Sequence, residues 1–342
     1  MSRRGGEELM VPRAEFQSYY GRPVLKTPVW THDIAAYLFT GGLAAGSSLL
    51  AAGADLTDRP ALRRAGRTAS VGALLASTAL LVKDLGRPER FLNMLRVAKP
   101  TSPMSMGSWI LTVYGGAAGA AAVAEMARPL VDRGRFGAIG RLVAASGRPA
   151  GLAAAAVSPA LATYTAVLLS DTAVPSWHEA YPELPFVFAG SALASGAGVG
   201  LIAAPTREVA PAQRMAVLGA AVEMVAARSV RHRLGQLSEP YTTGRPGRLL
   251  HMGEVLTAAG VAGSVVGRRS RAVRMLSGAA LLSASLATRF GIFEGGVEST
   301  KDPKYVVVPQ RQRLGERRGA EVQRTTSVTP SARAGSSSPT TG

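Results

Sequence analysis

Long apolar runs, separated by short charged segments, dominate the chain. Residues 34–54, 100–124, 149–170 and 184–206 contain no Asp, Glu, Lys or Arg. A helix crosses the hydrocarbon core of a bilayer with about 20 consecutive apolar residues. Four uncharged runs of that length are hard to accommodate as core helices of a soluble protein. The pattern therefore predicts an all-α integral membrane protein.

About eight transmembrane helices are expected. They fall near residues 34–54, 68–86, 108–126, 149–170, 184–205, 211–230, 249–267 and 273–293. The sixth run is short and contains Glu223, so it crosses only if Arg214 and Arg228 extend their side chains to the two interfaces. Otherwise the number of spans falls to seven.

A repeated pattern divides these helices into two groups. Residues 28–33 (Pro-Val-Trp-Thr-His-Asp) precede the first span, and residues 175–179 (Pro-Ser-Trp-His-Glu) precede the fifth. The repeat indicates two parallel four-helix bundles, whereas the alternative is shared membrane composition with an interfacial Trp. The expected domains are a polar N-terminal arm (1–33), a first bundle (34–170), a second bundle (171–298) and a basic, largely disordered tail (299–342).

Charge and cysteine content narrow the possible partners. The net charge is +17, but the Arg residues lie between apolar runs, which favours anionic lipid headgroups over nucleic acid. The chain has no Cys, so it forms no disulfide and cannot hold an iron–sulfur cluster by itself. Lys and Arg divide evenly between the two sides of the predicted bundle. Only the tail favours a cytoplasmic position for both termini, in the inner (cytoplasmic) cell membrane.

The loop between the second and third predicted spans carries the most distinctive sequence. Residues 83–96 (Lys-Asp-Leu-Gly-Arg-Pro-Glu-Arg-Phe-Leu-Asn-Met-Leu-Arg) are followed by 100–109, which is too long and too patterned for a minimal hairpin. Together with residues 30–46 and 289–304, this stretch resembles the NrfD/PsrC family of polysulfide reductase membrane subunits. The resemblance covers roughly residues 15–313.

The resemblance implies a quinone-interacting subunit without haem or iron–sulfur clusters of its own. Such a subunit is non-catalytic. It exchanges electrons and protons between a membrane quinone such as menaquinone and a four-cluster ferredoxin-like subunit, usually with a molybdopterin catalytic subunit, in a respiratory chain. The absence of Cys is compatible with that division of labour.

Three side chains at the start of the first span suit a quinone headgroup. His32, Asp33 and Tyr37 cluster at the membrane boundary, with Tyr37 about one helical turn beyond Asp33. His32 can donate to a quinone oxygen and exchange a proton near neutral pH, and Asp33 can fix its ring. The alternative is an interfacial anchor with Asp33 as a helix N-cap. Tyr164, inside the fourth span, is expected to donate either to the quinone or to another helix.

Other charged residues suggest docking and proton transfer. In the patterned loop, Arg87 and Arg90 are expected to dock the cluster subunit and Asp84 to relay protons, unless these residues form only a solvated loop. Glu223 and Glu254 lie within predicted spans, where ionisable groups are costly and suggest function. They serve either a proton path or an internal ion pair, such as Glu254 with Arg289.

Two other classes of protein compete with this interpretation. A haem b cytochrome needs paired His residues within the bilayer, but His178 and His232, two of the four His residues, fall in predicted loops. A secondary transporter would explain the repeat and the intramembrane charges. The long patterned loop favours a docking surface instead.

Overall fold

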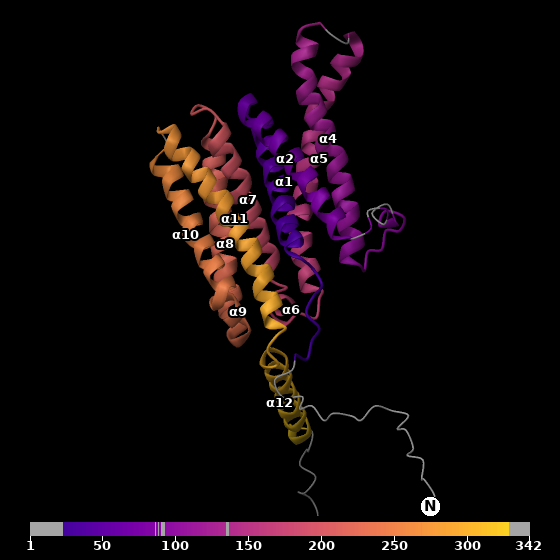
Figure 1. The fold of residues 1–342 in the computed structure, drawn as a ribbon, viewed down its shortest axis with the longest axis vertical. Coiled ribbons are helices and arrows are strands. Elements are labelled where there is room, and N and C mark those ends of the chain that lie inside the picture. The colour runs from indigo at the N-terminus through magenta and orange to yellow at the C-terminus, as the bar shows by residue number, and fades with distance from the viewer. Residues whose placement is uncertain are drawn as a thin grey trace, which may run out of the picture.

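The structure is a computed structural model that describes residues 23–327 except 86, 88, 90–92, 135–136 and 268, with side chains described up to residue 319. In this part of the chain, every regular element is helical. Figure 1 shows long helices running side by side, with α12 beyond one end of the bundle and the α4–α5 hairpin projecting beyond the other.

The long helices follow the predicted spans. They are α1 (His32–Leu56), α2 (Pro60–Asp84), α4 (Pro103–Asp132), α5 (Gly137–Ser170), α7 (Leu184–Ala203), α8 (Ala210–Leu234), α10 (Gly244–Val266) and α11 (Arg271–Ser299). By length and composition, 7 of the described helices can cross a membrane, and α8 is not among them. It corresponds to the sixth predicted span, and its 25 residues match α1 in length. The prediction of an all-α integral membrane protein is confirmed.

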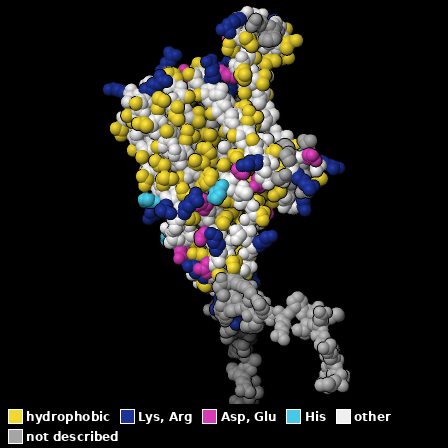
Figure 2. Space-filling model, viewed as in Figure 1, with side chains coloured by type: hydrophobic (Ala, Val, Ile, Leu, Met, Phe, Trp, Pro, Cys, Tyr) yellow, Lys and Arg dark blue, Asp and Glu magenta, His cyan; other side chains and the backbone are white. Residues whose placement is uncertain are grey.

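The outer surface agrees with a membrane environment. Figure 2 shows a broad hydrophobic face over α8, α10 and α11, with Lys and Arg gathered towards its two ends. Large apolar side chains such as Leu218, Val225, Val255 and Leu276 point outwards on these helices. Exposed apolar side chains of this kind are stable in contact with lipid chains and unfavourable in water.

Proline and hydroxyl side chains mark where the helices begin. Proline stands in the first turn of α2, α4, α7 and α8, where its missing N–H costs no hydrogen bond. Thr31 caps α1 by accepting a hydrogen bond from the backbone N–H of Asp33 (3.3 Å), and Ser102 caps α4. Asp33 therefore lies in the first turn of α1, so the alternative of an N-cap role for it is wrong.

The centre of the bundle is the contact between α1 and α7, which depends on glycine. A Cβ atom on Gly46 would lie 1.9 Å from the carbonyl oxygen of Ala192, and one on Gly196 would lie 2.3 Å from the carbonyl carbon of Gly46. No larger residue fits at either position without separating the two helices. Around this contact, α1 packs on α2 and α5 as α7 packs on α8 and α11. The division into two four-helix bundles stays a prediction.

Short helices cover the end of the bundle at which α1 begins. They are α6 (Pro175–Glu179), η1 (Gly235–Ser238) and α9 (Glu239–Thr242), and α12 (Lys304–Ser327) follows α11. The structure places part of the expected tail in α12, whose first residues contact the bundle, and the disorder of the tail stays a prediction. Lys304 pairs with Glu239 (2.9 Å), Tyr305 is buried, and Arg313 pairs with Glu179. Residues 328–342 lie outside the described part of the chain.

Candidate functional site at the start of the first span

The first turn of α1 meets the C-terminal ends of α2 and α11. We call this group the boundary cluster, and it consists of Trp30, Thr31, His32, Asp33, Lys83, Asp84, Phe290 and Glu294. Hydrogen bonds, ion pairs and ring contacts join its members. It brings together residues at the start of α1, at the end of α2 and in α11, which are far apart in the sequence.

His32 is held by α11. Its Nε2 lies 3.2 Å from Oε1 of Glu294, and its ring stacks on Phe290 with centroids 6.1 Å apart and planes 11° apart. The His32 side chain is 63% exposed, whereas that of Glu294 is 12% exposed. Glu294 also pairs with Arg245 of α10 (3.4 Å). The expectation that Asp33 fixes the His32 ring is therefore wrong, because Glu294 occupies that role.

Asp33 and Asp84 are tied to the same boundary by other partners. Asp33 pairs with Lys83 at the end of α2 (2.9 Å), and the Thr31 hydroxyl donates to Oδ1 of Asp84 (3.2 Å). The start of the patterned loop thus returns to the first turn of α1.

Aromatic rings connect the two Trp-containing segments of the repeat. Trp30 stacks on Trp177 of α6 with centroids 6.0 Å apart. Trp177 is fully buried, donates from Nε1 to the carbonyl oxygen of Ile292 (2.8 Å), and contacts the ring of Phe293. The repeated segments are therefore neighbours in space, beside the ring of His32.

The two tyrosines proposed for the site are buried below this boundary. Tyr37 is 5% exposed and Tyr164 is 9% exposed, and both belong to one buried apolar cluster. The Tyr164 ring lies against α4, where a Cβ atom on Gly107 would lie 2.4 Å from Cε2 of that ring. A third tyrosine was missed by the sequence analysis: Tyr114 is fully buried and its hydroxyl bonds to Ser48, Ser70 and the carbonyl oxygen of Ala44.

A network of buried charges lies at the opposite end of α1 and α2. Arg67 bonds to Glu125 of α4 (2.9 Å), to Asp55 of α1 (3.1 Å) and to the carbonyl oxygen of Gly147 of α5 (2.7 Å). Arg63 also bonds to both carboxylates. These residues were missed because their partners come from four separate helices. The network ties those helices together, since each carboxylate has a guanidinium partner.

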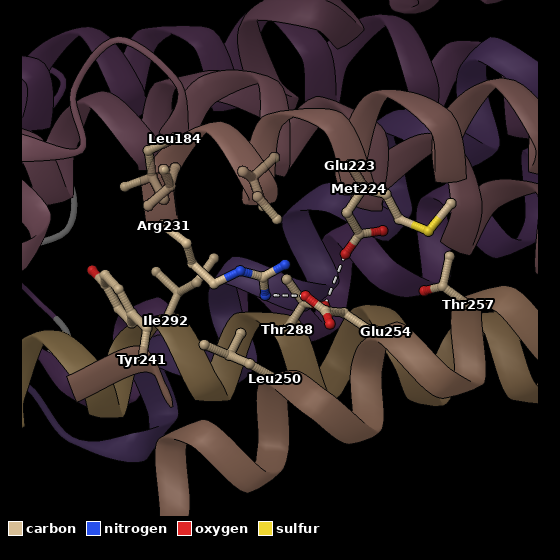
Figure 3. Close-up of a pocket in the computed structure, with 13 residues that line it drawn as sticks. Leu184, Glu223, Met224, Arg231, Tyr241, Leu250, Glu254, Thr257, Thr288 and Ile292 are labelled. Atoms are coloured by element: carbon tan, nitrogen blue, oxygen red, sulfur yellow. Dashed lines mark hydrogen bonds and ion pairs between the residues drawn. The ribbon is translucent and has the colours of Figure 1, made fainter. Parts of the chain in front are cut away.

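A pocket opens among α7, α8, α9, α10 and α11 (Figure 3). Its cavity has a volume of about 50 Å³, and its lining includes Glu223, Arg231, Glu254 and Thr288. Thr288 donates to Oε1 of Glu223 (2.8 Å), and Arg231 pairs with Glu254. The suggested pair of Glu254 with Arg289 is therefore wrong.

Arg289 points to a different neighbour. It is fully buried and donates from Nη2 to the carbonyl oxygen of Phe188 (2.7 Å). Its Cζ atom lies 3.7 Å from the centre of the Phe188 ring.

The docking residues are only partly described. Arg87 is exposed, and Arg90 lies outside the described residues. Docking at the patterned loop stays a prediction. Across the described residues, no group of three or more His, Asp or Glu side chains could hold a metal ion.

The helices and their apolar surface define a multi-pass integral membrane protein. A family model described as polysulphide reductase, NrfD, matches residues 23–230, which is more than half of the chain, and the chain belongs to this family. Its members are membrane subunits of quinone-linked oxidoreductases. The match includes α1 and most of α8 and ends before Glu254 and Glu294. A comparison with curated proteins finds no match.

Proposed function

We propose that this chain exchanges electrons and protons between a quinone of the menaquinone type and an iron–sulfur partner subunit, with the quinone headgroup bound at the boundary cluster. The observation that carries the proposal is the His32 imidazole, which is exposed yet fixed by Glu294 and Phe290. Family membership supports the quinone-linked role in general.

The chemistry of the cluster suits this role. Conversion of a quinone to a quinol takes up two electrons and two protons, so proton donors within hydrogen-bond reach of its oxygens are required. When Nε2–H donates to Glu294, the Nδ1 atom of a neutral His32 ring accepts from a quinol hydroxyl, and a protonated ring donates from Nδ1 to a quinone oxygen. Tyr37 and Tyr164 supply further hydroxyl groups from the buried side.

Proton transfer needs groups that reach the aqueous side. Asp33 with Lys83, and Asp84 with Thr31, provide ionisable groups at the bundle surface next to His32. Glu223 and Glu254 are proposed as a second proton-transfer group in the pocket of Figure 3.

The partner subunit is proposed to dock over the same end of the bundle. Electrons must arrive close to the quinone, and the chain has no Cys that could hold a cluster. A four-cluster ferredoxin-like subunit would bind the patterned loop through Arg87 and Arg90, and a molybdopterin subunit would complete the enzyme. The exposed Arg317 and Arg318 of α12 add positive charge to this end.

Photolabelling of the purified, assembled complex with an azido-quinone tests the site. Labelled peptides are expected to contain residues 30–37 or 290–294, and excess unlabelled quinone should prevent the labelling. Competed labelling confined to peptides of α8 and α10 would place the quinone in the other half of the bundle and contradict the proposal.

A further inference from the structure

Glu223 and Arg289 are opposite charges on two helices inside the bundle. The Glu223 residue on α8 is 6% exposed, and the Arg289 residue on α11 is fully buried. Arg289 also reaches α1, since a Cβ atom on Gly42 would lie 2.9 Å from its Nη2 atom. The two side chains attract each other electrostatically, but they make no direct hydrogen bond among the described residues. Glu223 therefore has a nearby counter-charge but lacks a direct ionic partner.

The carboxylate of Glu223 is only half satisfied by protein. Oε1 accepts from Thr288, whereas within the described chain Oε2 is buried and has no hydrogen-bond partner. A buried polar atom without a partner is costly, and the cost is greatest where lipid surrounds the protein. A small polar molecule that bonds Oε2 would remove this cost.

The cavity beside Glu223 has the size for water. Its volume is about 50 Å³. Because one water needs about 10–15 Å³ of such space, the cavity holds roughly three to five. Apolar side chains, among them Val187 and Leu250, form most of the wall. The polar part of the lining therefore includes the half-satisfied carboxylate, the hydroxyl groups of Thr288, Thr257 and Tyr241, and the Arg231–Glu254 pair.

The mouth of the cavity is charged. Figure 3 shows Arg231 and Glu254 facing each other between Tyr241 and the buried Glu223. Their side chains are 35% and 37% exposed, so both reach the surface of the bundle. The ionisable groups facing Glu223 among the described residues are Arg231 from α8 itself, Tyr241 from α9, Glu254 from α10 and Arg289 from α11. Helix α7 contributes no ionisable group there: Leu184 and Val187 line the pocket, and Gly190 packs against the backbone of Glu223.

We propose that Glu223 forms a hydrated acid–base site that exchanges protons with the aqueous side at which α8 ends, through waters that pass the Arg231–Glu254 pair. One proton passes along these waters from a hydronium ion on the aqueous side to Oε2 of Glu223: an O–H bond of the hydronium ion breaks and leaves water, and an O–H bond to Oε2 forms. The proton returns by the same waters. No electron is transferred. Arg289 supplies the opposite charge that balances the ionised form. The inference deepens the proton-transfer part of the proposed function, but its test needs no quinone.

Infrared difference spectra of the purified full-length protein, recorded between two pH values in H2O and D2O, test the site. We expect a carboxyl C=O band that changes with pH, shifts in D2O, and is lost in Glu223→Gln. It should remain in Glu183→Gln, a matched change at a carboxylate that pairs with Arg233 outside the pocket. If Glu223→Gln does not accumulate, Thr288→Val should shift the same band. A band unchanged in both variants, or unaffected by prolonged D2O exposure, would overturn the proposal.

The route is tested separately with single cysteines in this Cys-free chain. Ala227 lines the pocket, whereas Val225 on the same helix is 71% exposed and does not line it. A bulky thiol reagent on Ala227→Cys should slow the D2O shift of the Glu223 band, and the same reagent on Val225→Cys should not. Equal exchange rates in the two labelled variants would refute this route. If the wild-type protein shows this band but its assembled complex has no quinone-linked turnover, the proposed quinone function fails and the inference about Glu223 stands.

Discussion

At the scale of single residues, the His32 imidazole depends on a carboxylate 262 positions later in the chain. Glu294 bonds to Nε2 of His32, and Phe290 stacks on the His32 ring. Trp177 stacks on Trp30, which lies two residues before His32 in the chain. His32 is thus exposed but restricted in orientation, as a residue that binds a headgroup and transfers protons must be. Glu294 and Phe290 lie one turn apart on α11, so one helix supplies both restraints.

Removal of the charge on Glu294 should therefore impair quinone chemistry. A hydrogen bond to a charged group contributes about 1.5–3 kcal/mol, so Glu294→Gln should lower quinone-linked turnover about tenfold to a hundredfold. Glu298→Gln, one turn later on α11, is the matched control, because that side chain is 51% exposed and pairs only locally with Lys301. Steady-state kinetics of the two complexes measure the difference. Equal turnover in both would show that Glu294 does not orient His32.

At the scale of helices, buried polar groups join elements that are distant in sequence. Glu208, between α7 and α8, accepts hydrogen bonds from the backbone N–H groups of Ala61 (2.8 Å) and Leu62 (3.0 Å) and so caps α2. At the same end of the bundle, Arg67 joins four helices through Asp55, Glu125 and Gly147. Small residues let the helices approach, and these bonds fix how the helices are placed.

The Arg67 network should contribute strongly to stability. Arg67→Met leaves the buried carboxylates short of a partner and should lower the free energy of unfolding by about 3–5 kcal/mol. Arg64→Met is the control, because the Arg64 side chain is 66% exposed and lies 3.7 Å from Glu125. That change should cost about 1 kcal/mol or less. Denaturant or thermal unfolding in detergent measures both, and equal losses would contradict the role assigned to Arg67.

The helices could be predicted from the sequence because the length of an apolar run is read from one continuous segment, without knowledge of its neighbours in space. The predicted centre of each span lies within an observed helix, and Pro60, Pro103 and Thr31 mark starts earlier than those of the predicted spans. His32 could be selected because of its position at a span boundary. Its partner could not, since which helix packs on α1 is decided by close contacts such as Gly46 on Gly196. For the same reason, Arg289 was suggested as an ion-pair partner of Glu254, although the partner is Arg231.

At the scale of the whole molecule, the polar helix α8 decides the topology. It packs along α7 and reaches from Ala210 to Leu234, yet it carries Glu223 and several Arg residues. Burial of Glu223 and the position of Arg231 at a bundle end are the means by which such a helix can cross lipid. If α8 crosses, the start of α1 and the end of α11 lie on one side.

Single cysteines placed at exposed positions test this topology. Val29→Cys and Gln310→Cys should react with an impermeant thiol reagent from one side of sealed vesicles, and Leu56→Cys from the other. Arg207→Cys and Gln236→Cys, at the two ends of α8, should react from opposite sides. Reaction of these last two from the same side would show that α8 does not cross and that seven spans remain.

The most direct measurement of the central claim is quinone-linked turnover of the assembled complex with His32→Ala. Loss of a positioned proton-transfer group should lower turnover by about a hundredfold or more, while the soluble subunits still reduce artificial dyes. His251→Ala, at an exposed histidine of α10, should leave both activities unchanged. Tyr37→Phe should give a smaller loss, because it removes one hydroxyl and keeps the ring. Wild-type quinone kinetics in His32→Ala, Asp33→Asn and Tyr37→Phe alike would contradict a quinone site at the boundary cluster.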